Sequence, residues 1–257
     1  MLNLPEHALD DEPIFTAADL LRQRWGKSRA PQVPPPHTVI IGHQRAVLDA
    51  VFKRYRHSSI AGFFGDFRLL RTRGQPIGVL RPVGPGAPII ASVLEELIAF
   101  GVQRVIAIGL AGGLQSDLHA GDVVIADRAL RDEGTSYHYL PPARSVEADP
   151  ALVQHLSAAL SAHGVAHSIG ASWTTDAPYR ETRREIAAHR IDGIKTVEME
   201  TAALFAVGQR WQVPTAAVLV IGDRLADLAW QPPAAARVIE QRLKIVAEVS
   251  VTAFSEE

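Results

Sequence analysis

Residues 197–205 read VEMETAALF, and residues 218–224 read VLVIGDR. In the first segment, Glu198 and Glu200 precede small and apolar residues whose spacing predicts a helix. In the second segment, Asp223 follows an apolar run that predicts a buried strand. A carboxylate at the end of a buried element is costly unless it has a partner or a function. The two segments therefore indicate either an acidic first turn and a strand-end turn, or parts of one functional site.

Helices and strands alternate outward from these two segments. The strands are apolar throughout, so the pattern predicts an α/β domain whose parallel or mixed sheet is covered on both faces. In such a sheet, ligands bind beyond the carboxyl ends of the strands, where most of the unusual polar residues of this sequence lie. The predicted strands span residues 38–42, 67–72, 76–82, 104–109, 121–126, 167–172 and 216–221, and the predicted helices span residues 16–27, 45–55, 89–100, 149–163, 181–188, 197–207 and 237–253.

The composition limits the class of protein. With 257 residues and 47% hydrophobic content, the chain is long enough for one large core. A net charge of −2 favours neither nucleic acid nor a membrane surface as a partner. The absence of cysteine excludes disulfides and thiolate chemistry, and it fits a cytoplasmic protein. The histidines do not lie at ligand spacing, so we expect no metal site.

Residues 1–37 are expected to form a peripheral N-terminal extension of a single domain at residues 38–257. Residues 1–7 lack the basic and apolar pattern of a signal peptide. The chain has no run of about 18 apolar residues, so no transmembrane helix is expected. The three prolines at 34–36 predict an extended connector into the first strand.

Two glycine-rich segments follow predicted strands. Residues 83–88 read VGPGAP, and residues 108–114 read IGLAGGL. The G-x-G-x-x-G spacing of dinucleotide-binding proteins is absent from both. Each segment is predicted to be a turn or loop, which serves either a tight chain reversal alone or a close approach of the backbone to a ligand. In the second interpretation, the two turns line one pocket.

Six segments, taken in order, resemble the purine-nucleoside and uridine phosphorylase family, which also includes nucleosidases that use water. The resemblance covers most of the chain. It implies one α/β domain with a twisted mixed β-sheet flanked by helices, assembled as a homo-oligomer, either a dimer or a hexamer. The segments are residues 83–88, 108–114, 121–124 (GDVV), 131–139 (RDEGTSYHY), 174–179 (TTDAPY) and 197–200 (VEME).

The resemblance implies a role for each acid of the two decisive segments. Met199 and Glu200 match the pair that holds the ribose, in which the Glu accepts hydrogen bonds from the 2′- and 3′-hydroxyls. Glu198 lies where purine-type members keep a Glu near the base and the sugar. Asp223 matches the acid that purine-cleaving members place beside N7 of the base, and Arg224 is assigned to the catalytic group with it.

The resemblance implies further substrate contacts at the strand-end segments. Thr175 and Tyr179 belong to the segment that forms the wall against which the base stacks. Gly109 and Gly112 belong to the glycine cluster beside the substrate.

These roles fit the chemistry of breaking an N-glycosidic bond. The reaction builds positive charge on the sugar and negative charge on the leaving base. A carboxylic acid at Asp223 protonates that base, and a carboxylate at Glu200 orients the sugar near the developing positive charge. Uridine-cleaving members instead use a Gln and an Arg on the base. Thr182 occupies the Gln position here, although Arg184 is a candidate for the Arg, so we expect a purine base.

The site for the nucleophile departs from the family pattern. Phosphorolytic members bind phosphate with an Arg and with a Ser or Thr near the strand-end glycines, where this chain has Ala107 and Leu110. Their first-strand loop reads Gly-Asp-Pro-x-Arg, whereas residues 42–45 read GHQR. Gly42 and Arg45 are the candidate phosphate ligands that remain.

The expected activity is phosphorolysis of a purine nucleoside, which gives the free base and ribose 1-phosphate. Phosphate is then a co-substrate, and no other cofactor is expected. Hydrolysis by a nucleosidase is the alternative, because phosphate ligands are replaced. A non-catalytic nucleoside-binding protein is a further alternative, against which the intact Glu200 and Asp223 argue. His138 or His43 is a candidate for a residue that completes the site of a neighbouring subunit.

Overall fold

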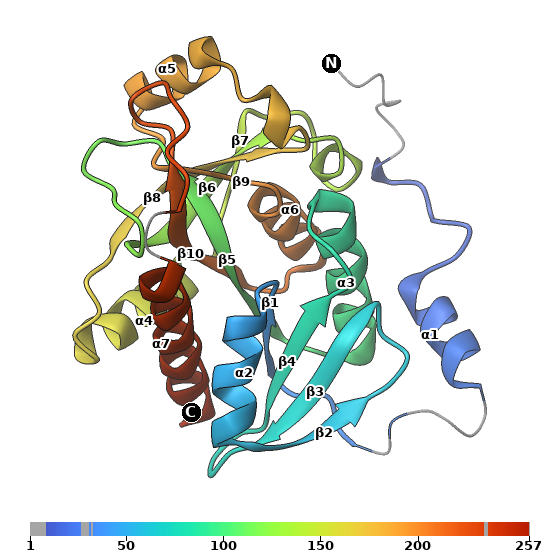
Figure 1. The fold of residues 1–257 in the computed structure, drawn as a ribbon. Helices are drawn as coiled ribbons and strands as arrows, with labels where there is room; N and C mark the ends of the chain where they lie inside the picture. The colour runs from blue at the N-terminus through green and yellow to red at the C-terminus, as the bar shows by residue number, and fades with distance from the viewer. Residues whose placement is uncertain (1–8, 27–30, 32, 234–235, 257) are drawn as a thin grey trace.

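Ten strands form one mixed sheet in the part of the chain that the computed structural model describes, residues 9–26, 31, 33–233 and 236–256. Helices cover both faces of this sheet (Figure 1), which confirms the predicted fold class. The strands are β1 (Thr38–Gly42), β2 (Arg56–Ile60), β3 (Gly65–Arg71), β4 (Ile77–Pro82), β5 (Arg104–Gly113), β6 (Val123–Asp132), β7 (Ser145–Glu147), β8 (Ser168–Thr175), β9 (Thr196–Glu198) and β10 (Thr215–Arg224). The α-helices are α1 (Ala17–Trp25), α2 (Arg45–Arg54), α3 (Ala87–Phe100), α4 (Pro150–Ala162), α5 (Arg183–Ile191), α6 (Thr201–Trp211) and α7 (Ala236–Ser255).

Five of the strands close into a ring. β10 pairs with β5 on one side and with β6 on the other, and the circle continues through β8 and β9 back to β5. The strands β1, β4, β3 and β2 extend the sheet outward from β5. Gly112 of β5 is the Cα partner of both Val197 in β9 and Asp223 in β10. The ring therefore brings the two acidic segments to the same end of β5.

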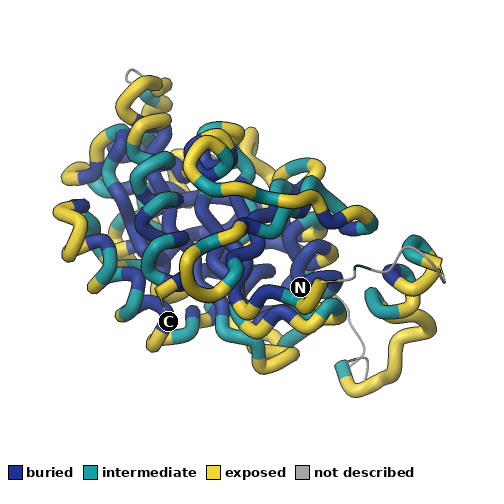
Figure 2. The backbone as a smooth tube through the Cα atoms, turned by 90° about the horizontal axis from the view of Figure 1, so that it is seen from below, coloured by how far each residue is buried: buried dark blue, intermediate teal, exposed yellow. Residues whose placement is uncertain are grey.

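The core lies between the sheet and two groups of helices. Helix α7 contacts both α2 and α4, and α3 contacts both α6 and α1. Buried backbone is concentrated in the central strands, whereas the N-terminal segment lies at the margin (Figure 2). Helix α6 is buried along most of its length, because its residues 201–208 are small or apolar and pack against the strand ring.

Local sequence signals explain several helix boundaries. Thr16 and Asp19 form a capping box at the start of α1, as the predicted cap at Thr16 requires. Asp149 caps α4 by accepting a hydrogen bond from Leu152 N. Gly101 ends α3 in the left-handed conformation, with φ of 108°.

Several predicted boundaries were wrong, because strands continue through residues that break the apolar pattern. Strand β5 extends to Gly113 through the segment predicted as a loop, and β10 includes Asp223 and Arg224, which were predicted to follow it. The predicted helix at 197–207 begins at Thr201, and Val197 belongs to the short strand β9. Strand β2 was not predicted. In each case pairing with a neighbouring strand holds the backbone extended.

Helix α1 ties the N-terminal segment to the domain. Trp25 packs edge-on against Phe63 and Phe100, and its indole N–H donates to the Ala61 carbonyl at 2.8 Å. Arg24 donates to Glu96 Oε1 at 2.5 Å. The domain boundary at residue 37 stays a prediction, but α1 itself packs on α3 and on the loop that joins β2 to β3.

Among the described residues, the longest helices are too short or too polar to cross a membrane.

Candidate active site

Glu198 organises the start of helix α6 from within the core. Its Oε2 accepts hydrogen bonds from the amides of Glu200 and Thr201, both at 2.7 Å. Its Oε1 accepts from the hydroxyls of Thr174, at 2.6 Å, and Ser172, at 3.2 Å. Burial, reinforced by the nearby Glu200 carboxylate, raises the pKa of Glu198 to about 6. Both oxygens are engaged within the protein, so the predicted contact of Glu198 with a substrate stays a prediction.

Glu200 lies between α6 and the turn that follows β4. Its Oε1 accepts a hydrogen bond from the amide of Gly86 at 2.5 Å. Burial raises the pKa of Glu200, while that amide opposes the shift. The neighbouring Met199 is half-buried. The predicted glycine-rich turn at 83–88 therefore has a defined task, because its backbone fixes the carboxylate that the sequence assigns to the ribose.

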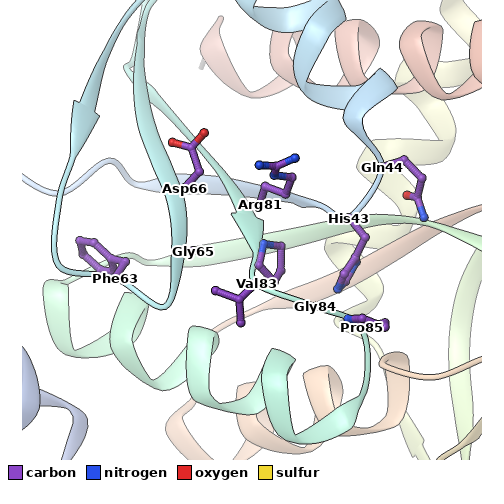
Figure 3. A pocket seen from close by; sticks show the side chains of 10 residues that line it. His43, Gln44, Phe63, Gly65, Asp66, Arg81, Val83, Gly84 and Pro85 are labelled. Carbon is purple, nitrogen blue, oxygen red and sulfur yellow. The ribbon is translucent and has the colours of Figure 1, made fainter.

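His43 lines a cavity of about 660 Å³ and lies beside Glu200. Its Nε2 lies 4.0 Å from Glu200 Oε1, and its side chain is only 14% exposed. Figure 3 shows the ring beside Pro85, with Asp66 and Arg81 at the same cavity. Burial lowers the pKa of His43, although the charge of Glu198 opposes this. His43 therefore lies beside Glu200 of its own chain, and its contribution to the site of a neighbouring subunit stays a prediction.

The wall of β5 beside this region is apolar. Ala107 is buried, and Leu110 keeps 36% of its surface exposed. Gly42 is the Cα partner of Ile108, so the chain passes from β1 into His43 alongside this wall. Gly109 lies in the same wall, where an added Cβ would meet only Leu219 within 4 Å. The two residues that replace phosphate ligands thus lie on the same strand, β5.

The structure shows the local environment of the candidate phosphate ligands Gly42 and Arg45. An added Cβ at Gly42 would lie 2.6 Å from Val47 Cγ1, so the packing of α2 on β1 requires glycine there. Arg45 is the first residue of α2, and its side chain is exposed. Their contact with phosphate stays a prediction.

Asp223 lies in β10, next to Gly112 at the end of the ring of strands. Its Oδ2 accepts a hydrogen bond from the indole of Trp230 at 2.6 Å, and the Trp230 side chain is largely exposed. Burial, together with the charge of Asp223, raises the pKa of Glu181 to about 7. The sequence analysis missed Glu181 and Trp230, because a loop and a helix start bring them to Asp223 only in the folded chain.

Gly112 separates the two acidic segments. An added Cβ there would lie 2.6 Å from Leu225 Cδ1, 3.0 Å from Val197 Cγ1 and 3.4 Å from Asp223 Oδ1. A side chain would therefore push against both neighbouring strands. This packing gives Gly112 a structural task beside its predicted substrate contact.

The remaining predicted residues lie further from this arrangement. Arg224 follows Asp223 on β10 and donates to Gln231 Oε1 at 3.3 Å and to the Ser116 carbonyl at 3.4 Å. Thr175 is buried, and Tyr179 is 99% exposed on the 3₁₀ helix Pro178–Arg180. The predicted base wall is thus open to solvent at Tyr179.

Thr182 and the segment 131–139, which the sequence singled out, both make contacts within the protein. Thr182 caps α5 in a capping box with Glu185, so its hydroxyl serves the helix. In the segment 131–139, Arg131 donates to Ser136 Oγ at 2.8 Å and lies over the ring of Tyr137. That segment holds its own shape through these contacts.

Comparisons with known proteins identify the family and support the fold. The family described as the phosphorylase superfamily matches residues 51–252. A uridine phosphorylase of Treponema pallidum is 35% identical over 205 residues, which cover 73% of this chain and 78% of the relative. A DeoD-type purine nucleoside phosphorylase of Latilactobacillus sakei is 31% identical over 181 residues, which cover 66% and 73%. The crystal structure of uridine phosphorylase from Vibrio fischeri superposes with a TM-score of 0.76 at 24% identity, covering 88% of this chain and 94% of that chain.

Proposed function

The chain belongs to the phosphorylase superfamily, and from this premise we propose that it cleaves the N-glycosidic bond of a purine nucleoside and releases the base. The observation that carries the proposal is the position of Glu200 and Asp223 at one end of the strand ring. Glu200 follows β9 and Asp223 lies in β10, and both strands pair with β5 at Gly112. In this arrangement the carboxylate assigned to the sugar and the one assigned to the base lie at the same end of β5.

Glu200 is assigned to the ribose. The amide of Gly86 fixes its Oε1, which leaves Oε2 for the 2′- and 3′-hydroxyls. A carboxylate held in this way also stabilises the positive charge that develops at C1′. The hydrogen bonds of Glu198 to the amides of Glu200 and Thr201 support this by holding the start of α6 in place.

Asp223 is assigned to the leaving base. A protonated carboxyl group that donates to N7 stabilises the purine as the bond to C1′ breaks. Trp230 engages only Oδ2, so Oδ1 is available for that contact. The use of Thr182 as a helix cap supports a purine, because this side chain is already committed where uridine-cleaving members use a Gln.

Two nucleophiles are consistent with the reaction. Phosphate is suggested by the names of the relatives, and it would give ribose 1-phosphate. Water is favoured by Ala107 and Leu110, because an oxyanion site without a bidentate Arg and a hydroxyl is weak.

A substrate assay tests the proposal. The protein is incubated with inosine, adenosine, 5′-methylthioadenosine and uridine, each with and without phosphate, and free base is measured by chromatography. Purine release is the expected result, and release that depends on phosphate identifies a phosphorylase. Release from uridine alone would overturn the purine assignment, and no release from any nucleoside would overturn the activity.

Glu200→Ala provides the site control for this assay. Loss of the carboxylate should weaken ribose binding and turnover together, whereas normal kinetics would remove Glu200 from the site. We also propose a homo-oligomer, either a dimer or a hexamer, which light scattering coupled to size-exclusion chromatography measures directly.

A further inference from the structure

We propose that His43 holds the attacking water beneath C1′ of the nucleoside and accepts its proton. This role rests on the proposed function and selects water from its two nucleophiles. The proposal is based on the position of His43. Its Nε2 lies beside the carboxylate of Glu200, and its side chain lines an open cavity.

His43 Nε2 is a buried polar atom with no hydrogen-bond partner among the described residues. A buried nitrogen left in this state costs on the order of 1–3 kcal/mol, so a ligand that satisfies it is favoured. The cavity of about 660 Å³ gives such a ligand room. The unsatisfied atom therefore indicates a small hydrogen-bonding molecule at this position.

The separation of His43 Nε2 from Glu200 Oε1 suits a bridging water. The two atoms lie 4.0 Å apart, which is too long for a direct hydrogen bond. A single oxygen can stand about 2.8 Å from both, at the apex of a triangle, and donate one proton to each. Because Glu200 also orients the ribose in the proposed function, this water lies next to the sugar.

The charges around His43 keep it able to accept a proton. The charge of Glu198 favours the imidazolium, and the Glu200 carboxylate lies 4.0 Å from Nε2. Arg81 of β4 and its Cα partner Asp66 of β3 line the cavity beside His43. Burial outweighs these effects and lowers the pKa of His43 below its ordinary 6.5. The ring is therefore neutral near pH 7, as a general base must be.

The neighbouring residues of β5 do not provide ligands for an anion as large as phosphate. Ala107 and Leu110 offer neither charge nor hydroxyl, and Arg45 is exposed on α2. Phosphate would need several donors at this place, whereas water needs only the two acceptors described.

The chemical step balances with the groups present. The water oxygen forms a bond to C1′, and its proton passes to His43 Nε2. The bond from C1′ to the base nitrogen breaks, its electron pair stays on the base, and Asp223 supplies a proton to the base. The products are ribose and free base, and solvent returns the proton from His43 to Asp223.

The test compares His43→Ala and His43→Gln with the matched control His119→Ala, in the full-length chain without phosphate. His119 is an exposed residue of the turn between β5 and β6. Base release is measured from pH 5 to pH 9, and thermal unfolding reports whether each variant folds. We expect both His43 variants to lose about 10²–10⁴-fold in kcat with a smaller change in KM, and to lose the acid limb of the pH profile. The control should match the wild type.

The possible results separate this role from the proposed function. Unchanged kcat and an unchanged acid limb in a folded His43→Ala or His43→Gln protein would overturn the role of His43 alone. Wild-type base release that requires phosphate would also overturn it, while the proposed function stands. A wild-type protein that releases no base from any nucleoside would overturn both.

Discussion

The two sides of the site are built in different ways. The cavity side consists of His43, Glu200 and the turn at 83–86, and backbone and buried residues hold it. The strand-end side consists of Asp223, Glu181 and Trp230, and its indole is 65% exposed. Core packing thus positions the groups assigned to the sugar and the nucleophile, while the last residues of β10 and the loops beside them supply the strand-end side. A change of base specificity can therefore arise on the strand-end side without disturbing the cavity side.

Replacement of the proposed acid should give the largest effect and should act on only one side. We expect Asp223→Asn to lower kcat for purine release by about 10²–10⁴-fold, because an amide cannot donate a carboxylic proton to the base. Steady-state kinetics with the purine nucleoside that the substrate assay identifies measures this. Asp227→Asn, in the loop that follows β10, is the control, because Asp227 is exposed and accepts a hydrogen bond from Gln231. Wild-type kcat in Asp223→Asn would remove the acid from the mechanism.

A change far from both carboxylates should weaken the cavity side alone. In Arg24→Ala, Glu96 loses its charged partner while it is only 3% exposed, and we expect a loss of about 1–3 kcal/mol in the free energy of unfolding. Glu96 also accepts from the amide of Phe64, in the loop beside the cavity, so KM should rise. Urea denaturation measures the first effect, with Arg22→Ala on the exposed face of α1 as control. Equal stabilities of the two variants would contradict the inference that α1 supports the loop.

Removal of the indole hydrogen bond should change the strand-end side moderately. Trp230→Phe keeps an aromatic ring but removes the indole hydrogen bond to Asp223 Oδ2, so either carboxyl oxygen, and not Oδ1 alone, can then contact the base. We expect KM for the nucleoside to fall by about two- to tenfold, which corresponds to one hydrogen bond. Trp211→Phe, which removes an indole bond to Glu95, controls for the substitution itself. A higher KM in Trp230→Phe would instead indicate that Trp230 contacts the substrate.

The smallest expected effect is a change in how stability depends on pH. Burial raises the pKa of Glu181 from 4.5 to about 7, so the folded protein binds this proton more tightly than the unfolded chain does. The contribution of Glu181 to stability is therefore complete below about pH 4.5 and is lost as the pH rises to 7. In Glu181→Gln, the unfolding midpoint should fall less over that range, by about 2 °C at most, because solvent screens a half-exposed group. Parallel slopes for both proteins would show that Glu181 does not titrate in this way.

The sequence predicted most of the elements, because their signals are local. An apolar run at residues 39–41 that ends in a glycine marked β1, and helical spacing that begins at Thr16 marked α1. Strand β9 has only three residues, and its pairing with β5 and β8 holds it extended. No local pattern distinguishes such a segment from the first turn of a helix.

The site was predictable only in part, for a similar reason. Glu200 and Asp223 could be proposed from a resemblance in sequence order. Glu198, whose contact with the substrate stays a prediction, accepts hydrogen bonds from the amides of Glu200 and Thr201 at the start of α6, as an acid before a helix often does. The position of His43 opposite Glu200 depends on how β1 and α6 meet, and a single histidine after a glycine carries no signal of that contact.

Gly112 has a consequence for how this protein can change. Variation at Leu110 or Tyr179 alters a surface, and libraries at these positions can explore new substrates while most members still fold. A library at Gly112 would consist almost entirely of inactive members, since each new side chain meets two strands at once. Positions such as Leu110 and Tyr179 should therefore tolerate many substitutions, whereas Gly112, which lies between the two sides of the site, should tolerate few.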